Sequence, residues 1–213
     1  MDEENMGENK AILINNQGNL LSDYLKSNLI PVVEDQDYVA GDGVIPANDV
    51  VIDGQDITIS YTICYDATYY QYLLTMDDDT VLFINPSWDW EEIVDLNYRM
   101  QGISAIQSGV VLFKPTVDGY SIVTDPYGKI SYKENTLGQD YEKVYYADVP
   151  NGRIDTVFQH IYKIINPMWT VLVVYVLVRL IIVLVKNILE WIHKRKDKNN
   201  DNINNDKESF DSV

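Results

Sequence analysis

The stretch Ile57-Thr-Ile-Ser-Tyr-Thr-Ile-Cys64-Tyr-Asp66 carries the strongest indication of the fold. Its β-branched and apolar residues up to Cys64 are typical of a short strand buried inside a layered domain. Residues 67–76 follow directly and are predicted to be a helix. Cys64 is therefore expected at a sharp turn from strand to helix, where backbone N–H groups can stabilise both a thiolate and an oxyanion.

Further strands and helices are predicted on both sides of this stretch. Residues 50–52 and 81–85 are short apolar runs of the same kind, and residues 91–107 suit a second helix. Residues 11–25 and 119–132 each place turn-forming residues (Asn-Gln-Gly in one, Asp-Pro-Tyr-Gly in the other) between two strand-like runs, which predicts two hairpins. Strands interspersed with helices, without an internal repeat, favour an α/β sandwich.

Composition limits the classes of function. The 213 residues allow one domain of ordinary size plus an anchor, and an apolar fraction of 46% is enough to form a core. The net charge of −17 lies almost entirely before the apolar C-terminal segment and argues against a nucleic-acid partner. Cys64 is the only cysteine, which excludes an internal disulfide and a multi-cysteine metal site. We predict neither a bound metal nor a cofactor.

Residues 168–189 are predicted to form one transmembrane helix. Residues 168–185 read MWTVLVVYVLVRLIIVLV and contain a single charge. Trp169 and Trp191 flank the segment 22 residues apart, about 33 Å along a helix, which matches a hydrocarbon core with interfacial tryptophans. The length and the flanks favour a membrane-spanning helix over a buried core helix.

The charges around this segment predict its orientation. In the tail, residues 191–213, the basic run His-Lys-Arg-Lys-Asp-Lys occupies residues 193–198, and the polar residues 199–213 are expected to be disordered. The positive-inside rule then places the C-terminus in the cytoplasm and the preceding domain outside the cell membrane. Arg179 lies in mid-span, where a charge costs roughly 2.5–3.5 kcal/mol, so a transmembrane partner is expected beside it.

Several short motifs, taken together and in order, resemble one family. Ile63-Cys-Tyr-Asp66 resembles Ile-Cys-Tyr-Glu of the carbon–nitrogen hydrolase (nitrilase) superfamily, within it the C-terminal part of the apolipoprotein N-acyltransferases. Residues 26–34, Lys-Ser-Asn-Leu-Ile-Pro-Val-Val-Glu, resemble that family's Lys-x-x-Leu-Val-Pro-Phe-x-Glu. Further similar segments are Phe-Ile-Asn-Pro-Ser-Trp at residues 83–88, the hairpin at residues 119–130, and Asp-Val-Pro at residues 148–150.

The resemblance implies a fold and an activity. Residues 1–165 would form an incomplete αββα sandwich of the nitrilase type, followed by the membrane helix. Cys64 would be the thiol nucleophile, Lys26 would stabilise the tetrahedral oxyanion, and Glu34 would be an auxiliary carboxylate. The implied reaction moves an acyl group from a phospholipid donor to the N-terminal amine of a lipoprotein acceptor through a cysteine thioester.

The sequence also departs from the family pattern. The family's general-base glutamate lies tens of residues before the lysine, whereas 25 residues precede Lys26 here. The early Glu3, Glu4 and Glu8 match no family motif and are interpreted as solvated. We therefore expect the chain to be a C-terminal piece of a longer protein or a degenerate relative. Other departures are Gln107 in place of glutamate, Val117 in place of asparagine, and Arg99 as the remnant of an arginine-rich helix.

These departures keep two other functions open. The first is a catalytically inactive, membrane-tethered module that binds another membrane protein through its acidic domain and Arg179. The second is a tethered amidase that acts on a small extracytoplasmic amide. The membrane helix favours a lipid substrate over a small amide.

Overall fold

A computed structural model describes residues 6–139 and 142–210, with side chains left out at residue 166 and at residues 193–210. The chain divides into two compact units, Met1–His160 and Ile161–Val213. The first unit is a mixed α/β domain. The second consists of the greater part of one long helix.

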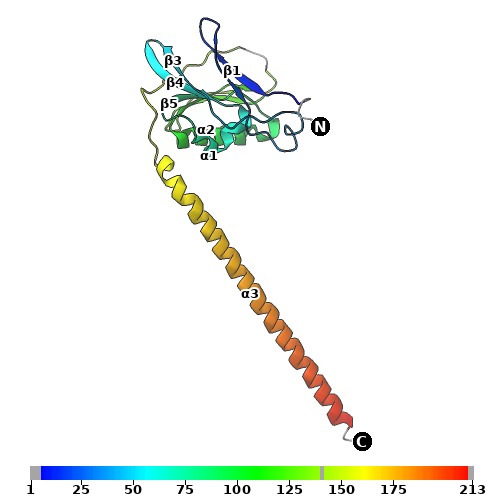
Figure 1. Cartoon of the computed structure of the whole chain (residues 1–213). Coiled ribbons are helices and arrows are strands. Elements are labelled where there is room, and N and C mark those ends of the chain that lie inside the picture. The colour runs from blue at the N-terminus through cyan, green and yellow to red at the C-terminus, as the bar shows by residue number, and fades with distance from the viewer. Residues whose placement is uncertain (1–5, 140–141, 211–213) are drawn as a thin grey trace. The chain divides into compact units, whose positions relative to one another are not determined.

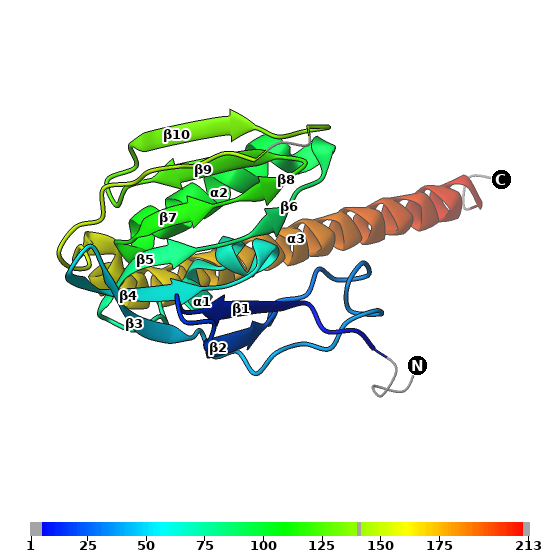
Figure 2. The ribbon, with the colours of Figure 1, turned by 90° about the horizontal axis from the view of Figure 1, so that it is seen from above.

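A six-stranded mixed sheet forms the centre of the first unit. Its strand order is β10-β9-β7-β5-β4-β3, as Figure 2 shows. The neighbours β4, β5 and β7 run parallel, whereas β3, β9 and β10 pair antiparallel at the two edges. The bounds are β3 Ala47–Ile52, β4 Gln55–Tyr61, β5 Thr80–Ile84, β7 Val111–Lys114, β9 Tyr120–Thr124 and β10 Ile130–Asn135. The three strands predicted around and including the opening stretch are therefore confirmed.

Both faces of this sheet are apolar, because successive side chains of a strand point to opposite faces. Phe83 and Leu112 are fully buried toward the helices, in one cluster with Ile122. The preceding residues of β5 and β7, Leu82 and Val111, belong to a second cluster. Near-continuous apolar strands of this kind are what a sheet covered on both sides requires.

Two helices cover one face of the sheet, and Figure 1 shows them beneath it. The longer, α2 (Val94–Ser108), begins after the 3-10 turn η3 (Glu91–Ile93) and confirms the helix predicted for residues 91–107. It ends at Gly109, whose left-handed φ of +71° provides the C-cap that glycine suits best. A Cβ at this position would lie 1.8 Å from the carbonyl oxygen of Ile154.

The helix predicted for residues 67–76 is shorter and more irregular than expected. A 3-10 helix, η2 (Cys64–Thr68), starts at Cys64 itself, and α1 (Tyr70–Leu73) adds one turn of α-helix. Tyr69 separates them with an extended backbone at φ −93° and ψ 93°. The prediction was wrong in length because this extended residue interrupts the helical hydrogen bonds.

The first predicted hairpin is confirmed as a separate two-stranded sheet. Its strands are β1 (Lys10–Ile14) and β2 (Leu20–Leu25). In the turn, the side chain of Asn15 accepts hydrogen bonds from the backbone N–H groups of Gln17 and Asn19 at 3.0 and 2.9 Å. Figure 1 shows β1 on the side of the sheet opposite the helices. The hairpin is attached there through Tyr24, which shares an apolar cluster with Tyr61 of β4.

The second predicted hairpin, β9–β10, is confirmed as one edge of the main sheet. Asp125 shapes its turn, since its carboxylate accepts hydrogen bonds from the N–H groups of Tyr127 and Lys129 at 2.9 and 2.8 Å. Gly128 takes a positive φ of +87° in the same turn. Asp, Pro and Gly therefore stand where the sequence pattern placed them.

The second unit contains α3 (Val157–Phe210), whose first residues belong to the first unit. Its part Val157–Ile192 is long and apolar enough to cross a membrane, and its most apolar window is exposed throughout. The helix begins before residue 168 and continues through residues 199–210, for which we predicted a disordered tail. No glycine or proline interrupts the chain between residues 168 and 210. Residues 211–213 of the predicted tail lie outside the described residues.

Candidate active site

Cys64 lies in a strained turn directly after β4. Its φ of +48° falls in the left-handed region, which a residue with a Cβ adopts at a cost. Backbone hydrogen bonds hold it there, because its N–H donates to the carbonyl of Pro86 at 2.9 Å and its carbonyl accepts from Gln101 at 3.1 Å. The thiol is half-buried and contacts the carbonyl oxygen of Trp88 at 3.6 Å. The turn thus presents one thiol in a fixed direction.

The carboxyl ends of three parallel strands bring the polar side chains of the site together. Cys64 follows β4, Asn85 follows β5, and Lys114 ends β7. Strands β6 (Ser87–Trp88) and β8 (Thr116–Val117) form a small parallel sheet just beyond this edge. Crevices at the carboxyl ends of parallel strands are the usual ligand sites of open α/β sheets.

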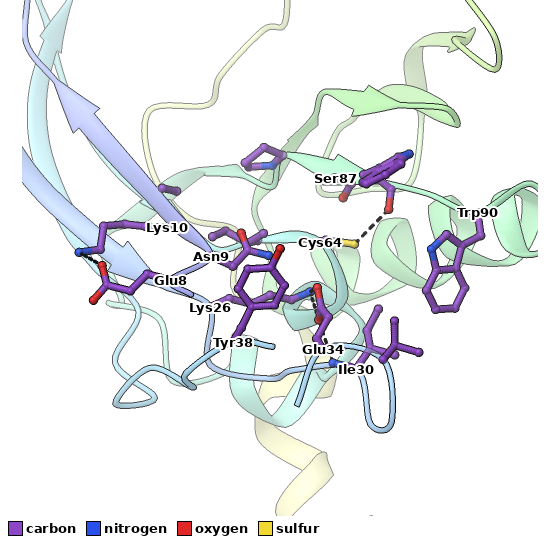
Figure 3. Close-up of a pocket in the computed structure, with 15 residues that line it drawn as sticks. Glu8, Asn9, Lys10, Lys26, Ile30, Glu34, Tyr38, Cys64, Ser87 and Trp90 are labelled. Atoms are coloured by element: carbon purple, nitrogen blue, oxygen red, sulfur yellow. Dashed lines mark hydrogen bonds and ion pairs between the residues drawn. The ribbon is translucent and has the colours of Figure 1, made fainter. Parts of the chain in front are cut away.

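Cys64, Lys26 and Glu34 line one pocket of about 630 Å³, shown in Figure 3. Lys26 follows β2 and is 1% exposed, although it carries a charge. Its ammonium group contacts both carboxylate oxygens of Glu34, at 2.7 and 2.5 Å. Glu34 is fixed further by the N–H of Ile30 at 2.8 Å. The structure therefore brings the three predicted site residues together, with the lysine paired to the glutamate.

Charges on two sides of the pocket act on the thiol. Burial raises the pKa of Cys64 above its ordinary value, and the negative charge of Asp89 raises it further. Lys26 and Lys114 oppose this change and lower the thiol pKa. A thiolate at Cys64 consequently depends on the two lysines for its stabilisation.

Asp66, two residues after the cysteine, connects the turn to the segment that carries Lys26. Its carboxylate accepts hydrogen bonds from the hydroxyl of Tyr24 at 2.7 Å, from the N–H of Asn28 at 2.6 Å and from the N–H of Ile63 at 3.1 Å. The residue is fully buried, and burial raises the pKa of its carboxyl group. Asp66 therefore holds the thiol and the lysine segment in one rigid arrangement.

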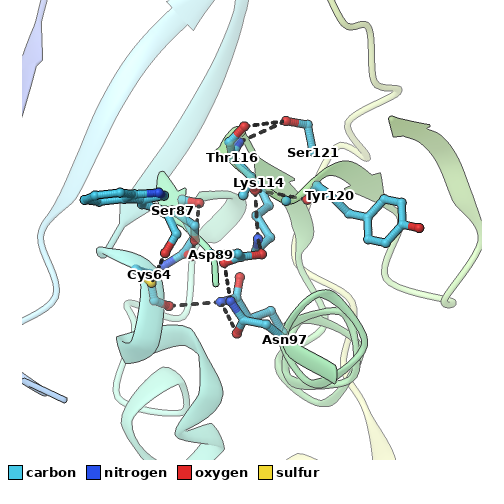
Figure 4. Close-up of polar contacts among 12 residues, drawn as sticks. Cys64, Ser87, Asp89, Asn97, Lys114, Thr116, Tyr120 and Ser121 are labelled. Carbon is cyan, nitrogen blue, oxygen red and sulfur yellow. Dashed lines mark hydrogen bonds and ion pairs between the residues drawn. The ribbon is translucent and has the colours of Figure 1, made fainter. Parts of the chain in front are cut away.

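A second polar cluster lies behind Cys64, on the side of α2, and Figure 4 shows its contacts. Lys114 and Asp89 form an ion pair at 2.8 Å with both side chains fully buried. Asn97 of α2 donates to Asp89 and accepts from Gln101 at 3.0 Å. Gln101 then donates to the carbonyl of Cys64.

Asn85 completes the support of the cysteine backbone. The side-chain amide makes the most hydrogen bonds when its oxygen accepts from the N–H of Cys64 at 3.1 Å and from the hydroxyl of Thr62 at 3.0 Å. The amide nitrogen then donates to the side-chain oxygen of Gln101 at 3.0 Å and to the hydroxyl of Ser87 at 2.9 Å. Two amide side chains therefore hold the backbone N–H and the carbonyl of the nucleophile position.

The rim of the pocket carries large apolar side chains. Trp88 is 68% exposed, Trp90 is 42% exposed and Val33 is 48% exposed, and all three line the pocket. Trp88 is oriented by a hydrogen bond from its indole N–H to Asp118 at 3.1 Å. An exposed aromatic rim beside a polar floor suits a ligand with an apolar portion.

Sequence reasoning missed several of these groups. Asp66, Asp89, Lys114 and Gln101 were not predicted as site residues. Lys114 carried a usable signal, because it is a charge at the end of the buried apolar run Val-Val-Leu-Phe. Asp89 carried none, since only the fold places it beside this lysine.

The remaining predicted positions lie around the pocket or away from it. Glu8, interpreted as solvated, is exposed but lines the pocket and pairs with Lys10 at 2.8 Å. Glu3 and Glu4 lie outside the described residues. Val117 is an exposed residue of β8 that pairs with Trp88. Further away, Arg99 lies over the ring of Tyr98, and the carbonyl of Gln107 accepts a hydrogen bond from Thr156. Among the described residues, no three His, Cys, Asp or Glu side chains gather so as to hold a metal ion.

Comparison with solved structures gives the fold independent support. An amidase from Nesterenkonia sp. superposes with a TM-score of 0.52 at 20% identity, over 60% of this chain and 51% of that one. A variant of that amidase, with the acetamide moiety of fluoroacetamide added covalently at its active-site cysteine, gives the same values. Another variant, in complex with butyramide, has a TM-score of 0.51 at 20% identity. At this identity the likeness is one of fold.

Comparison of sequences identifies the family. The chain spans about half the length of the amidases that it resembles in structure. No curated protein matches the sequence. The model of the carbon-nitrogen hydrolase family, however, matches residues 2–158, which is most of the chain. The chain therefore belongs to the carbon-nitrogen hydrolase family.

Proposed function

We propose that this chain is a membrane-anchored N-acyltransferase-like protein, or the C-terminal part of one. In this proposal it transfers an acyl group from a phospholipid to the N-terminal amine of a lipoprotein through a thioester on Cys64. The observation that carries the proposal is the pocket in which Cys64 faces the Lys26–Glu34 pair at the carboxyl ends of the parallel strands.

The chemistry assigns one step to each group. The Cys64 sulfur attacks the ester carbonyl of the donor, and the bond from the carbonyl carbon to the lysophospholipid oxygen breaks as the tetrahedral intermediate collapses. The thiol proton passes to that leaving oxygen through a carboxylate base, and Glu8 and Glu34 are the carboxylates that the described part of the pocket offers for this step. Lys26 stabilises the negative oxygen of that intermediate, since its ammonium group is buried and fixed by Glu34. The acceptor amine then attacks the thioester, so that an amide forms and the thiol regains its proton.

Two observations favour a lipid as the donor. The pocket rim exposes Trp88, Trp90 and Val33, which suits acyl chains better than a small polar amide. The same chain contains a helix apolar enough to cross a membrane. Such a helix keeps the domain close to a lipid substrate and raises its local concentration.

We further propose that the domain lies outside the cell membrane and that the C-terminus lies in the cytoplasm. The basic residues 193–198 directly after the apolar segment support this orientation. Protease added to intact cells should then degrade the domain and spare a tag fused after Val213. Protection of the domain together with loss of the tag would reverse the orientation.

Acyl labelling of the single thiol tests the catalytic part of the proposal. The full chain, reconstituted in vesicles of phosphatidylcholine that carries a labelled acyl group, should take up label in a hydroxylamine-sensitive form. Cys64→Ala should abolish this labelling. Lys26→Met should reduce it at least tenfold, because the oxyanion loses its cationic partner. Labelling of Cys64→Ala equal to that of the wild type would reject the thioester.

An inactive, membrane-tethered module is the second candidate, and one observation favours it. Within the described part of the chain, Glu8 and Glu34 are the carboxylates that line the pocket, and each is paired with a lysine. Neither is open to accept the thiol proton without losing its partner. This candidate predicts that Cys64→Ser preserves the biological function, whereas Arg179→Leu disrupts a complex with a membrane protein.

A further inference from the structure

The buried ion pair between Asp89 and Lys114 is not part of the pocket described above. Both side chains are fully buried, and the lysine also donates to the hydroxyl of Thr116 at 2.7 Å. Removing two charges from water costs several kcal/mol per ion, and well-packed apolar residues often stabilise a core equally well. Stability alone therefore does not explain this ion pair, and its contacts indicate its role.

The contacts of the pair lead to the nucleophile. Asp89 binds Lys114 with one carboxylate oxygen and accepts from the amide of Asn97 with the other. Asn97 orients Gln101, one turn further along α2, by a hydrogen bond of 3.0 Å. Gln101 donates to the carbonyl of Cys64 at 3.1 Å. Every member of this chain of hydrogen bonds up to Gln101 is buried, so water does not compete for the contacts.

The backbone conformation at Cys64 explains why these contacts are needed. With φ at +48° the turn is strained, and it persists only because its surroundings over-determine it. Asp89 also follows Trp88 directly, and the carbonyl of Trp88 is the contact of the thiol. The ion pair is therefore connected to Cys64 on two sides, through α2 and through β6.

We propose that Asp89 and Lys114 are positioning residues for Cys64: their ion pair anchors the hydrogen-bond chain that holds the cysteine in its strained turn and sets the charge around its thiol. This proposal rests on the proposed role of Cys64 as the nucleophile. Its readout, however, is the reactivity of the thiol and needs neither an acyl donor nor an acceptor.

The charges around the thiol support the proposal. Asp89 raises the pKa of Cys64 and Lys114 lowers it, and burial lowers the pKa of Lys114 itself. The two members of the pair therefore act on the thiol with opposite signs. The charged groups on the surrounding elements are Lys26, Glu34, Glu8 and Lys10 of the pocket lining, Asp66 in η2, Asp89 after β6 and Lys114 at the end of β7.

Single-charge variants test the electrostatic part. The full chain in detergent is alkylated with iodoacetamide across a pH range, and because it contains one cysteine, the rate reports on Cys64 alone. Asp89→Asn should move the midpoint of the pH profile to lower pH, and Lys114→Met should move it to higher pH. The matched control is Lys129→Met, an exposed lysine in the β9–β10 turn, which should leave the midpoint unchanged.

A variant that keeps both charges tests the positioning part. Asn97→Ala cuts the hydrogen-bond chain but leaves the Asp89–Lys114 pair in place, so it should fold even where a single-charge variant does not. We expect the plateau rate at high pH, where the thiol is fully ionised, to fall roughly fivefold, the effect of losing one ordinary hydrogen bond. The midpoint should stay close to that of the wild type.

Two results would overturn the proposal. An Asn97→Ala plateau equal to that of the wild type would show that the hydrogen-bond chain does not position the cysteine. Midpoints that shift in the same direction in Asp89→Asn and Lys114→Met, or do not shift while the unfolding temperature falls, would reduce the pair to a structural role. Failure of acyl transfer alone would affect the proposed function and not this inference.

Discussion

Removing the charge of Lys26 should both destabilise the domain and make the thiol less acidic. In Lys26→Met the carboxylate of Glu34 loses the ammonium group that contacts both of its oxygens. Breaking a buried ion pair on one side costs about 3–5 kcal/mol. Glu34 keeps 15% of its side chain exposed and retains the N–H of Ile30, so we expect the lower end, about 3 kcal/mol.

The double variant Lys26→Met/Glu34→Gln separates the unpaired charge from the loss of packing. Both sites are then neutral, and the amide oxygen introduced by Glu34→Gln can still accept from the N–H of Ile30. We expect the free energy of unfolding to return to within about 1 kcal/mol of the wild type, because neutral replacements of a buried pair are often tolerated. The single-variant effects should therefore be far from additive.

Two assays on the full chain in detergent measure these effects. Thermal unfolding followed by near-ultraviolet circular dichroism gives the loss of stability. The rate of alkylation of Cys64 as a function of pH gives the acidity of the thiol. The midpoint of this profile should rise in Lys26→Met, because Lys26 lowers the thiol pKa in the wild type. A Lys26→Met variant that is destabilised by less than about 1 kcal/mol and keeps the wild-type midpoint would refute the reasoning.

Three further predictions address other parts of the structure. Burial raises the pKa of Asp66, so the contribution of this carboxyl group to stability is present at low pH and is lost as the pH rises through its folded-state pKa. The free energy of unfolding of the wild type, relative to that of Asp66→Asn, should therefore increase as the pH falls from 7 toward about 4. Gly109→Ala should cost on the order of 3 kcal/mol in thermal unfolding, whereas the control Gly18→Ala, with positive φ but open space, should cost about 1 kcal/mol. In vesicles, single-tryptophan variants that retain Trp169 or Trp191 should be quenched more by lipids brominated near the headgroup than by lipids brominated at mid-chain, and the opposite order would contradict a span between them.

The fold was largely predictable because its local signals agree with one another. The apolar runs of β3, β4 and β5 and the turn residues around Gly18 and Gly128 each point to the element that forms. The break at Tyr69 was not predictable, because no glycine or proline marks it. Continuation of α3 to Phe210 was missed for the converse reason, since a polar composition argued for disorder where no residue ends the helix.

Of the candidate site, only residues that line the pocket were predictable from the sequence. Cys64, Lys26 and Glu34 stand in motifs that can be read along the chain, and the structure places them in one pocket. Asp89 and Lys114 are 25 residues apart and meet because two parallel pairings, β5 with β7 and β6 with β8, bring their segments side by side. Contacts that depend on strand order leave no local pattern in the sequence. The structure therefore adds the layer behind the thiol, which holds its backbone and sets its charge.

The most direct test of the account is the chemical state of Cys64 after exposure of the reconstituted full chain to phospholipid vesicles. Mass spectrometry of the peptide that contains Cys64 should show an acyl group that hydroxylamine removes, and this group should be absent from Cys64→Ala. The acyl group should also disappear from Cys64 when a lipopeptide with a free N-terminal amine is added, and the same acyl group should then appear as an amide on that amine. An unmodified Cys64 under these conditions, in a chain that folds as the wild type does, would contradict the proposed acyl transfer.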